Sequence, residues 1–335
     1  MKKFLPTLSL VVLLSSSSAG AVFAMGSQSF SDVPPGSDYY DAVGYLKTAG
    51  IIDGYADGTF KPYQPINRAE FTKIIVGSTG FMPASNDSGG NDSLTADGLK
   101  FSDVHDGNWF NPYLIKAVQM GYISGYPDGT FKPAQNINFV EASKIIVVSY
   151  GGDFAGAGYA PEDWFHKYVN ILEQKHDIPT TINTFDQQIT RGEMAEMMYR
   201  LKTENVGKPS MTYDDLATPK GFLTGTLSYP AEGVPPEMIV CADSTANAST
   251  YCTYSKINSP VYETGVGYSL PVPAGTYNVY AKVYVPASSN FVTGLYSDYV
   301  TCGMKQACTS HKSINVKVTA GATVKGIDPS DWYQN

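Results

Sequence analysis

The sequence of 335 residues predicts a multidomain α + β protein, in which a three-repeat helical module precedes a small antiparallel β-sandwich. A unit of about 47 residues recurs in the first part, and each copy has the apolar spacing of helices. In the last third, apolar and polar residues alternate, as they do in half-buried strands. Each part is long enough to bury a core of its own.

The N-terminus has the pattern of a secretory signal. Lys2 and Lys3 precede an apolar run from Phe4 to Leu14, and the small residues before position 25 suit cleavage after Ala24. The run of 11 apolar residues is shorter than the ~20 that a membrane-spanning helix needs. We therefore expect a secreted protein with no membrane insertion once the signal is removed.

The charge balance excludes several partners. Without Lys2 and Lys3 the chain carries 21 basic residues and 31 acidic ones, so its formal charge is 21 − 31 = −10. A chain this acidic is a poor general partner for nucleic acid or for anionic lipid. We expect neither.

Two segments of the first half repeat with a shift of 71 residues. Residues 50–76 align without gaps on residues 121–147, and 18 of the 27 positions are identical. Both copies contain G-Y-x-D-G-T-F-K-P, at Gly54–Pro62 and Gly125–Pro133, and both follow an F-S-D-V motif. The Asp-Gly pair within each copy indicates a tight turn.

A capping-box pattern, Asn or Thr three residues before Glu, opens the second helix of each repeat. It occurs at Asn67–Glu70, at Asn138–Glu141 and again at Thr190–Glu193. The last occurrence indicates a third, degenerate repeat, in which His176–Phe185 replaces the glycine-rich loop. Single units cannot bury their apolar faces alone, so we expect the three to pack together.

Residues 30–201 resemble the S-layer homology (SLH) family, whose marks are F-x-D-V, G-Y-x-D-G-x-F-x-P and T-R-A-E at the start of a helix. The resemblance implies a pseudo-threefold module of three repeats. It also implies that grooves between the repeats bind peptidoglycan-linked secondary polysaccharide, often pyruvylated. Phe139 stands where the family has arginine, so the groove of that unit is expected to be inactive or altered.

Two of the three arginines, Arg68 and Arg191, occupy the first position of capped helices. A guanidinium beside free helix amides suits an acidic sugar substituent, because it adds two parallel hydrogen bonds to the positive helix end. The alternative is a surface arginine that pairs with an acid such as Glu70. On either interpretation the side chain is expected at the surface, where removing it changes stability by only ~0.5 kcal/mol.

Other polar and aromatic residues of the repeats are further candidates. Trp109, Trp164 and either Tyr39 or Tyr40 could stack on sugar faces or pack between helices. Asp32 and Asp103 could accept hydrogen bonds from the glycan or cap the first helix. The full set of candidate glycan-binding residues is Arg68, Arg191, Asp32, Asp103, Tyr39, Tyr40, Trp109, Trp164, Gly54 and Gly125.

The last third differs in pattern and holds all four cysteines. Residues 277–285 and 314–318 alternate in polarity, and residues 268–277 resemble a hairpin of carboxypeptidase-regulatory or transthyretin-like domains. This resemblance implies a spacer or adhesion module. An even cysteine count in an exported chain favours two disulfides. Of the three possible pairings, Cys241–Cys252 with Cys302–Cys308 is slightly favoured.

No catalytic motif is present. The four histidines are scattered, and the sequence lacks metal-ligand spacings, a nucleophile elbow and a phosphate-binding loop. We expect no catalytic residue, metal or cofactor, and hence a surface protein anchored to cell-wall polysaccharide. Self-association or other surface proteins are further possible partners. The alternative is an anchored, secreted enzyme that acts on glycans through its C-terminal domain.

The sequence predicts the following division of the chain. Residues 1–24 are the signal peptide, 25–82 the first repeat, 83–100 a Ser/Asn/Gly linker, 101–151 the second repeat, 152–202 the degenerate third repeat, 203–220 a second linker, and 221–335 the β-sandwich domain.

Overall fold

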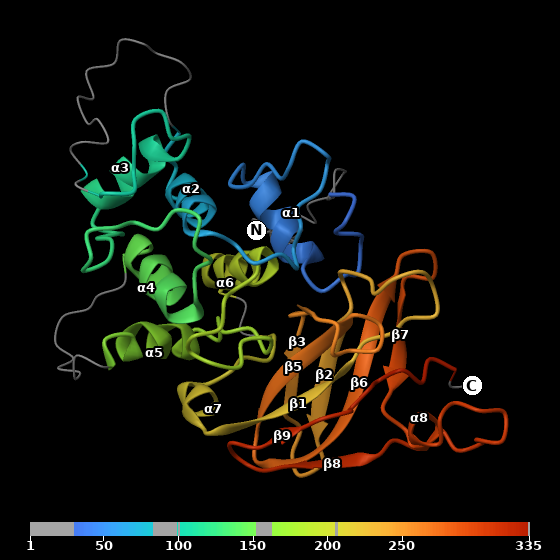
Figure 1. The fold of residues 1–335 in the computed structure, drawn as a ribbon. Helices are drawn as coiled ribbons and strands as arrows, with labels where there is room; N and C mark the ends of the chain where they lie inside the picture. The colour runs from blue at the N-terminus through green and yellow to red at the C-terminus, as the bar shows by residue number, and fades with distance from the viewer. Residues whose placement is uncertain (1–29, 83–98, 100, 152–162, 205–206, 334–335) are drawn as a thin grey trace, which may run out of the picture.

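Figure 1 shows the fold in a computed structural model, which describes residues 30–82, 99, 101–151, 163–204 and 207–333. The expected signal peptide, almost all of the first linker and the start of the third unit lie outside the described residues. Helices form the first part of the chain and two sheets the second, so the mixed α + β class is confirmed. In this fold, "unit 1", "unit 2" and "unit 3" denote residues 30–82, 101–151 and 163–204.

Each unit contributes a pair of helices. Unit 1 has α1 (Tyr40–Thr48) and α2 (Arg68–Ser78), unit 2 has α3 (Asn111–Gln119) and α4 (Phe139–Ser149), and unit 3 has α5 (His166–Gln174) and α6 (Arg191–Thr203). Side-chain caps start the second helix of each pair, where Asn67, Asn138 and Thr190 accept a hydrogen bond from the backbone N–H three residues on. These bonds satisfy amides that a helix start leaves free.

The three helix pairs close into a ring. The first helix of each unit packs against the second helix of the unit before it: α3 on α2, α5 on α4, and α1 on α6. At the centre, the N–H of Ile66 donates to the carbonyl of Ile189, that of Ile189 to Ile137, and that of Ile137 to Ile66, at 3.0–3.1 Å. All three isoleucines are fully buried, so the ring shares one core.

The expected second linker is largely ordered. After α6 the chain forms α7 (Tyr213–Ala217), which Thr212 caps, and α7 packs against α5. The Tyr213 ring stacks on the His166 ring with centroids 3.9 Å apart, and the Tyr213 N–H donates to the Glu173 carboxylate at 3.0 Å. The segment predicted as a polar linker thus contains a short helix, because its apolar and aromatic residues find partners on unit 3.

Two sheets make up the C-terminal domain (Figure 1). One sheet has the strand order β4-β5-β1-β9, and the other has the order β3-β2-β6-β7, with β8 also pairing β6. The strands are β1 (Lys220–Thr226), β2 (Ile239–Ser244), β3 (Thr250–Thr253), β4 (Ile257–Asn258), β5 (Val266–Pro273), β6 (Gly275–Val285), β7 (Asn290–Leu295), β8 (Asn315–Val318) and β9 (Thr323–Val324), with a short helix, α8 (Asp298–Thr301), between β7 and β8.

The strand pairing differs from the expectation at one place. Every pair is antiparallel except β1 with β9, which run parallel. The long β6 follows the predicted alternation, with buried residues such as Val279 and Ala281 facing the core. The favoured local disulfides are also present: Cys241–Cys252 joins directly opposed residues of β2 and β3, and Cys302–Cys308 closes the loop after α8.

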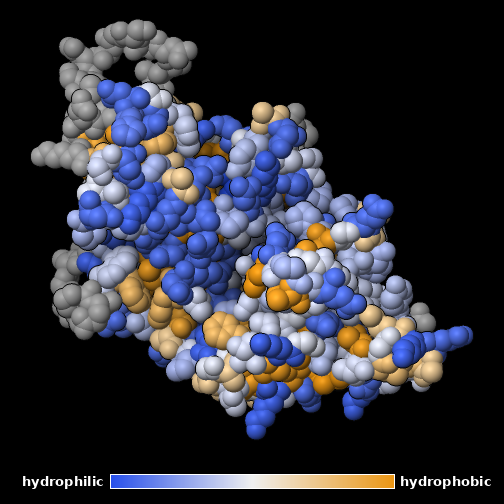
Figure 2. All heavy atoms as spheres, viewed as in Figure 1, coloured by the Kyte–Doolittle hydropathy of each residue, from blue (hydrophilic) through white to orange (hydrophobic). Residues whose placement is uncertain are grey.

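A cluster of tyrosines joins the ring to the sheet domain. The Tyr254 ring lies 4.5 Å from that of Tyr63 and 5.6 Å from that of Tyr39, and its hydroxyl donates to Asp38. Nearby, the Asn183 side chain donates to the Cys252 carbonyl at 2.7 Å. Figure 2 shows mostly hydrophilic side chains over the helical part, whereas more hydrophobic ones gather over the sheet domain. Among the described helices, none has the length and apolar character that crossing a membrane requires.

Candidate functional site

Arg191 of unit 3 reaches into the glycine-rich loop of unit 1. Its Nε–H donates to the Phe60 carbonyl at 2.7 Å, and its Nη1 lies 3.4 Å from the Glu70 carboxylate. The guanidinium carbon lies 4.7 Å from the ring centre of Tyr55 and 4.6 Å from that of Phe60, within cation–π range. The Tyr55 hydroxyl also donates to Glu70, at 3.1 Å. Burial raises the pKa of Tyr55, so this hydroxyl stays a donor.

Arg68 of unit 1 makes the same contacts with the loop of unit 2. Its Nε–H donates to the Phe131 carbonyl at 2.8 Å, and its Nη1 lies 3.6 Å from Glu141. The guanidinium lies 4.5 Å from the Tyr126 ring centre. The Tyr126 hydroxyl donates to Glu141 at 2.6 Å, and burial together with this bond raises the pKa of Tyr126 to about 12. Two junctions of the ring are therefore built alike.

The expectation of surface arginines was wrong. Arg68 and Arg191 are each only 5% exposed, because the aromatic rings of the neighbouring loop cover them. Burial also lowers the pKa of Arg68. The predicted pairing with an acid such as Glu70 does occur, but across the junction: Glu70 pairs with Arg191, whereas Arg68 pairs with Glu141.

A groove of about 190 Å³ lies over the Arg191 junction, and all three units line it. Trp109 of unit 2 forms one side and is 56% exposed, so it is available to a ligand rather than packed in the core. Lys73 on α2 adds a positive charge, although its Nζ lies 3.7 Å from Asp53. The lining residues are Ile51, Ile52, Asp53, Gly54, Tyr55, Glu70, Lys73, Ile74, Trp109 and Arg191.

The second junction has the counterparts of these residues. Trp164 of unit 3 corresponds to Trp109 and is 40% exposed. Lys144 on α4 corresponds to Lys73, and its Nζ lies 5.6 Å from the Trp164 ring centre. Burial, and next the nearby Lys167, lower the pKa of Lys144. Each junction thus combines a guanidinium, an ammonium and an exposed indole, a set suited to an acidic sugar.

The third junction lacks a guanidinium. Phe139 is fully buried there, and its N–H donates to the Gln187 carbonyl at 2.8 Å. Glu193 holds the position of Glu70 and Glu141 but accepts hydrogen bonds from the Gln187 side chain and the Thr190 N–H. Burial raises the pKa of Glu193. Phe139 in place of arginine therefore gives a physical reason to expect an altered groove in this unit.

Asp32 and Asp103 serve the loops rather than α1 or α3. The two oxygens of Asp32 accept from the N–H groups of Phe60 and Lys61, at 2.8 and 2.7 Å. Asp103 binds Phe131 and Lys132 at the same distances. Both lysines have a positive φ of 58°, so these bonds hold a sharp turn. This geometry does not match the predicted helix cap, whereas the glycan contact stays a prediction.

Gly54 and Gly125 are required by space and backbone angle. Their φ angles are 74° and 72°, and a Cβ atom would lie 2.2 Å from the Phe30 or the Phe101 ring. Gly54 also lines the Arg191 groove. The two glycines therefore shape the loops that receive the arginines.

The tyrosine candidates lie at the start of α1. Tyr39 is 4% exposed and packs in the cluster with Tyr63 and Tyr254, so it cannot stack on a sugar in this structure. Tyr40 is half-buried at the start of α1. Sequence reasoning missed Tyr55, Tyr126, Lys73 and Lys144 as site residues. The sequence could have indicated them, because Tyr55 and Tyr126, like Lys73 and Lys144, are related by the 71-residue shift of the repeat.

Comparison with known families adds an independent result to this geometry. The family model of the S-layer homology domain matches residues 29–72 and 100–142. These two segments are S-layer homology repeats. They contain both loops that receive an arginine, and Arg68 lies within the first. Among the described residues, no group of His, Cys, Asp and Glu side chains is arranged to hold a metal ion.

Several bacterial surface proteins share the S-layer homology repeats. The chain is 36% identical over 133 residues to Cell surface glycoprotein 1 of Acetivibrio thermocellus, covering 38% of this chain and 6% of that protein. It is 25% identical over 162 residues to the Middle cell wall protein of Brevibacillus brevis, covering 48% and 14%. It is 33% identical over 105 residues to a Cellulosome-anchoring protein of A. thermocellus, covering 31% and 22%. The chain thus spans less than a quarter of each of these relatives.

Proposed function

We propose that this chain is an exported surface protein, held non-covalently on the cell wall by its helical ring. On this proposal the ring is a module of three S-layer homology repeats, the third of them degenerate. The ligand is a peptidoglycan-linked secondary polysaccharide with acidic, for example pyruvylated, substituents. The relatives named as cell-surface, cell-wall and anchoring proteins support this location and role.

The observation that carries the proposal is the pair of alike junctions at Arg68 and Arg191. Nε and Nη1 of each guanidinium contact acceptors of the protein, which fixes the plane of the group, and its other N–H donors have no hydrogen-bond acceptor among the described residues. The indoles of Trp109 and Trp164 are exposed and can therefore pack on sugar rings. A fixed cation beside an aromatic face is suited to an acidic pyranose.

The sheet domain then acts as a spacer or adhesion module that the ring displays. Two disulfides brace it, which suits an oxidising environment outside the cell. A sandwich of the carboxypeptidase-regulatory or transthyretin-like type, and self-association into a surface layer, remain parts of the proposal.

The enzyme alternative has less support. Amylopullulanase of Thermoanaerobacterium thermosulfurigenes shares 30% identity over 118 residues, but this covers only 6% of that enzyme. A large cleft lies between the ring and the sheet domain, and among its described lining residues the ring supplies three carboxylates but the sheet domain, where this alternative places the active site, supplies only Glu237. Hydrolysis of glycosides ordinarily uses two carboxylates across the scissile bond.

Sedimentation with purified cell walls tests the proposal. We expect the full chain to pellet with intact walls and to remain in solution when the wall polysaccharide has been extracted. Equal sedimentation with both preparations would contradict a polysaccharide anchor.

A further inference from the structure

A cleft of about 1040 Å³ lies between the ring and the sheet domain, more than five times the volume of the Arg191 groove. Ligand pockets in proteins usually measure roughly 300–1,000 Å³. We propose that this cleft binds a neutral oligosaccharide with acetamido groups. The site is separate from the arginine junctions and does not depend on the function proposed for them.

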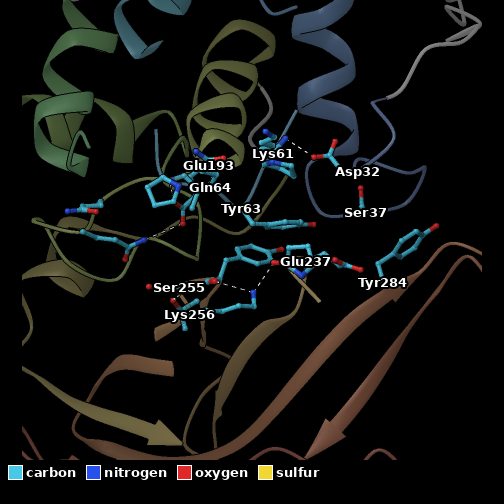
Figure 3. A pocket seen from close by; sticks show the side chains of 18 of the residues that line it. Asp32, Ser37, Lys61, Tyr63, Gln64, Glu193, Glu237, Ser255, Lys256 and Tyr284 are labelled. Carbon is cyan, nitrogen blue, oxygen red and sulfur yellow. Dashed lines mark hydrogen bonds between the residues drawn. The ribbon is translucent and has the colours of Figure 1, made fainter. Parts of the chain in front are cut away.

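The two walls of the cleft come from different parts of the chain (Figure 3). Unit 1 contributes Lys61–Pro65 and unit 3 contributes residues from Thr184 to Glu193. Opposite them lies the outer face of the β1–β5 pair, where Phe222 is 38% exposed, together with residues 253–256, which begin at the last residue of β3. The cleft is thus open along a sheet face that the ring overhangs but does not cover.

The apolar part of the lining suits the C–H faces of pyranose rings. Tyr63 is half-buried and projects between the walls in Figure 3, and Phe222 lies on the sheet face. Prolines supply further flat apolar surface on both sides of the cleft: Pro34, Pro62, Pro65, Pro236, Pro271 and Pro286. Apolar walls with a few placed polar groups are usual in sites for small ligands.

The charges of the lining argue against an anionic glycan. Four acids, Asp32, Asp186, Glu193 and Glu237, line the cleft with only two lysines. Lys256 donates to the carbonyls of Pro236 and Met238 at 2.8 and 3.0 Å, and burial lowers its pKa to about 8. Lys61 lies 3.5 Å from Asp57. Both lysines therefore already have acceptors within the protein.

Side-chain amides give the cleft its recognition chemistry. Gln64 and Gln188 are exposed on the wall that the ring provides, and each side-chain amide has both a donor and an acceptor, of which the Gln188 oxygen already accepts from Asn136 at 3.0 Å. An acetamido group needs one of each, together with an apolar contact for its methyl group. The hydroxyls of Ser255 and Ser269 on the opposite wall match sugar hydroxyls.

The walls are fixed relative to each other before any ligand binds. The Tyr254 hydroxyl donates to Asp38, and the Tyr284 hydroxyl donates to the Pro35 carbonyl. With the Asn183–Cys252 bond, these contacts bridge ring and sheet domain at the back of the cleft. A preformed cleft avoids the entropy cost of ordering two domains around a ligand.

Calorimetric titration of the full chain with the uncharged tetrasaccharide of N-acetylglucosamine tests the proposal. Ser269 projects from β5 into the cleft while its neighbours Tyr268 and Leu270 are buried on the other face, so Ser269→Trp fills the site without touching the core. We expect Ser269→Trp to weaken binding at least tenfold and Phe222→Ala to weaken it severalfold. Asn315→Trp places the same ring on exposed β8, away from the cleft, and should bind like the natural chain.

Two outcomes would overturn the proposal. One is no binding by the natural chain at about 10 mM tetrasaccharide, a concentration that detects even a millimolar Kd. The other is binding that Ser269→Trp leaves unchanged while its melting temperature matches that of Asn315→Trp. If a proline-rich peptide bound in the cleft and the tetrasaccharide did not, the proposed ligand class would also be wrong. The double variant Trp109→Ala/Trp164→Ala should keep its tetrasaccharide affinity, which separates this site from wall anchoring.

Discussion

Arg68 and Arg191 are structural residues as well as candidate ligands. Each guanidinium packs against Tyr and Phe rings of the next unit and donates to a backbone carbonyl that would otherwise be buried without this hydrogen bond. The sequence predicted that the two arginines occupy equivalent positions, and it offered pairing with an acid such as Glu70 as the alternative to glycan binding. It could not predict their burial, because the covering loop belongs to a unit 63 residues away for Arg68 and 131 residues away for Arg191.

Arg68→Ala should lower the free energy of unfolding by about 2–4 kcal/mol, because it leaves the Phe131 carbonyl without this donor and Glu141 without its nearby cation. Lys73→Ala is the matched control, since Lys73 is a cation of the same helix with a 41% exposed side chain. Its cost should stay within about 0.5 kcal/mol. Urea unfolding of both variants measures the difference, and equal losses would return Arg68 to the role of a surface charge.

A second prediction at this scale concerns Asp177. Its carboxylate is fully buried and has no hydrogen-bond partner in the part of the chain that the structure describes, and burial raises its pKa to about 7, against the opposing effects of Lys175 and Arg200. The folded state therefore holds a proton that the unfolded state, with a pKa of about 4, releases earlier. Stability due to this group is present below pH 4 and is lost as pH rises toward 7.

Asp177→Asn removes that titration. Relative to the natural chain, the variant should gain about 1–3 kcal/mol of unfolding free energy between pH 4 and pH 8. Unfolding curves at pH 4, 6 and 8 give the comparison. If the difference between the two proteins stays constant across this range, Asp177 is already ionised in the folded state.

At the scale of elements, the glycine-rich loop of one unit is shaped to receive the arginine that begins a helix of another unit. The Asp32 carboxylate holds the Phe60 and Lys61 amides, and the turn so formed offers the Phe60 carbonyl to Arg191. Repeats and capping patterns sufficed to predict the helices and the loop, because these depend on local residue order. The Asp32 contact joins segments 28 residues apart, so local residue order did not reveal it.

Gly54→Ala and Gly58→Ala test the crowding within this loop. Both glycines have positive φ, 74° and 80°, but a Cβ meets Phe30 and Thr59 only at Gly54, whereas Gly58 faces open space. The variant at Gly58 should cost about 1 kcal/mol for backbone strain alone. The one at Gly54 should cost about 3 kcal/mol or more through overpacking. Similar melting temperatures for the two variants would contradict the close approach of Phe30.

At the scale of the whole molecule, the ring and the sheet domain are packed against each other. α7 packs on α5, and the tyrosine cluster buries Tyr39, Tyr254 and part of Tyr63 between the two parts. Alternation of polarity predicted most strands and the even cysteine count predicted two disulfides. The docking was not predictable, because a tyrosine at a domain interface has the same sequence signature as one in a core.

The role of α7 gives a prediction at this scale. A fragment that ends at Ala217 should unfold at a higher temperature than one that ends at Leu201, because only the longer fragment keeps the Tyr213–His166 stack and the Met211–Ile178 hydrogen bond. For a ring of this size, about 1 kcal/mol corresponds to roughly 2–4 °C. Identical melting curves for the two fragments would show that α7 does not stabilise unit 3.

The central claim is that the junctions at Arg68 and Arg191 hold the cell-wall polysaccharide. Binding isotherms on purified walls with Trp109→Ala/Trp164→Ala test it most directly, because both indoles are exposed and their loss should leave the melting temperature unchanged. Tyr333→Ala is the matched control, since Tyr333 is a 59% exposed aromatic residue far along the chain from the ring. We expect the double variant to lose tenfold or more in affinity and the control to lose none. A double variant that binds walls as tightly as the natural chain would contradict the account.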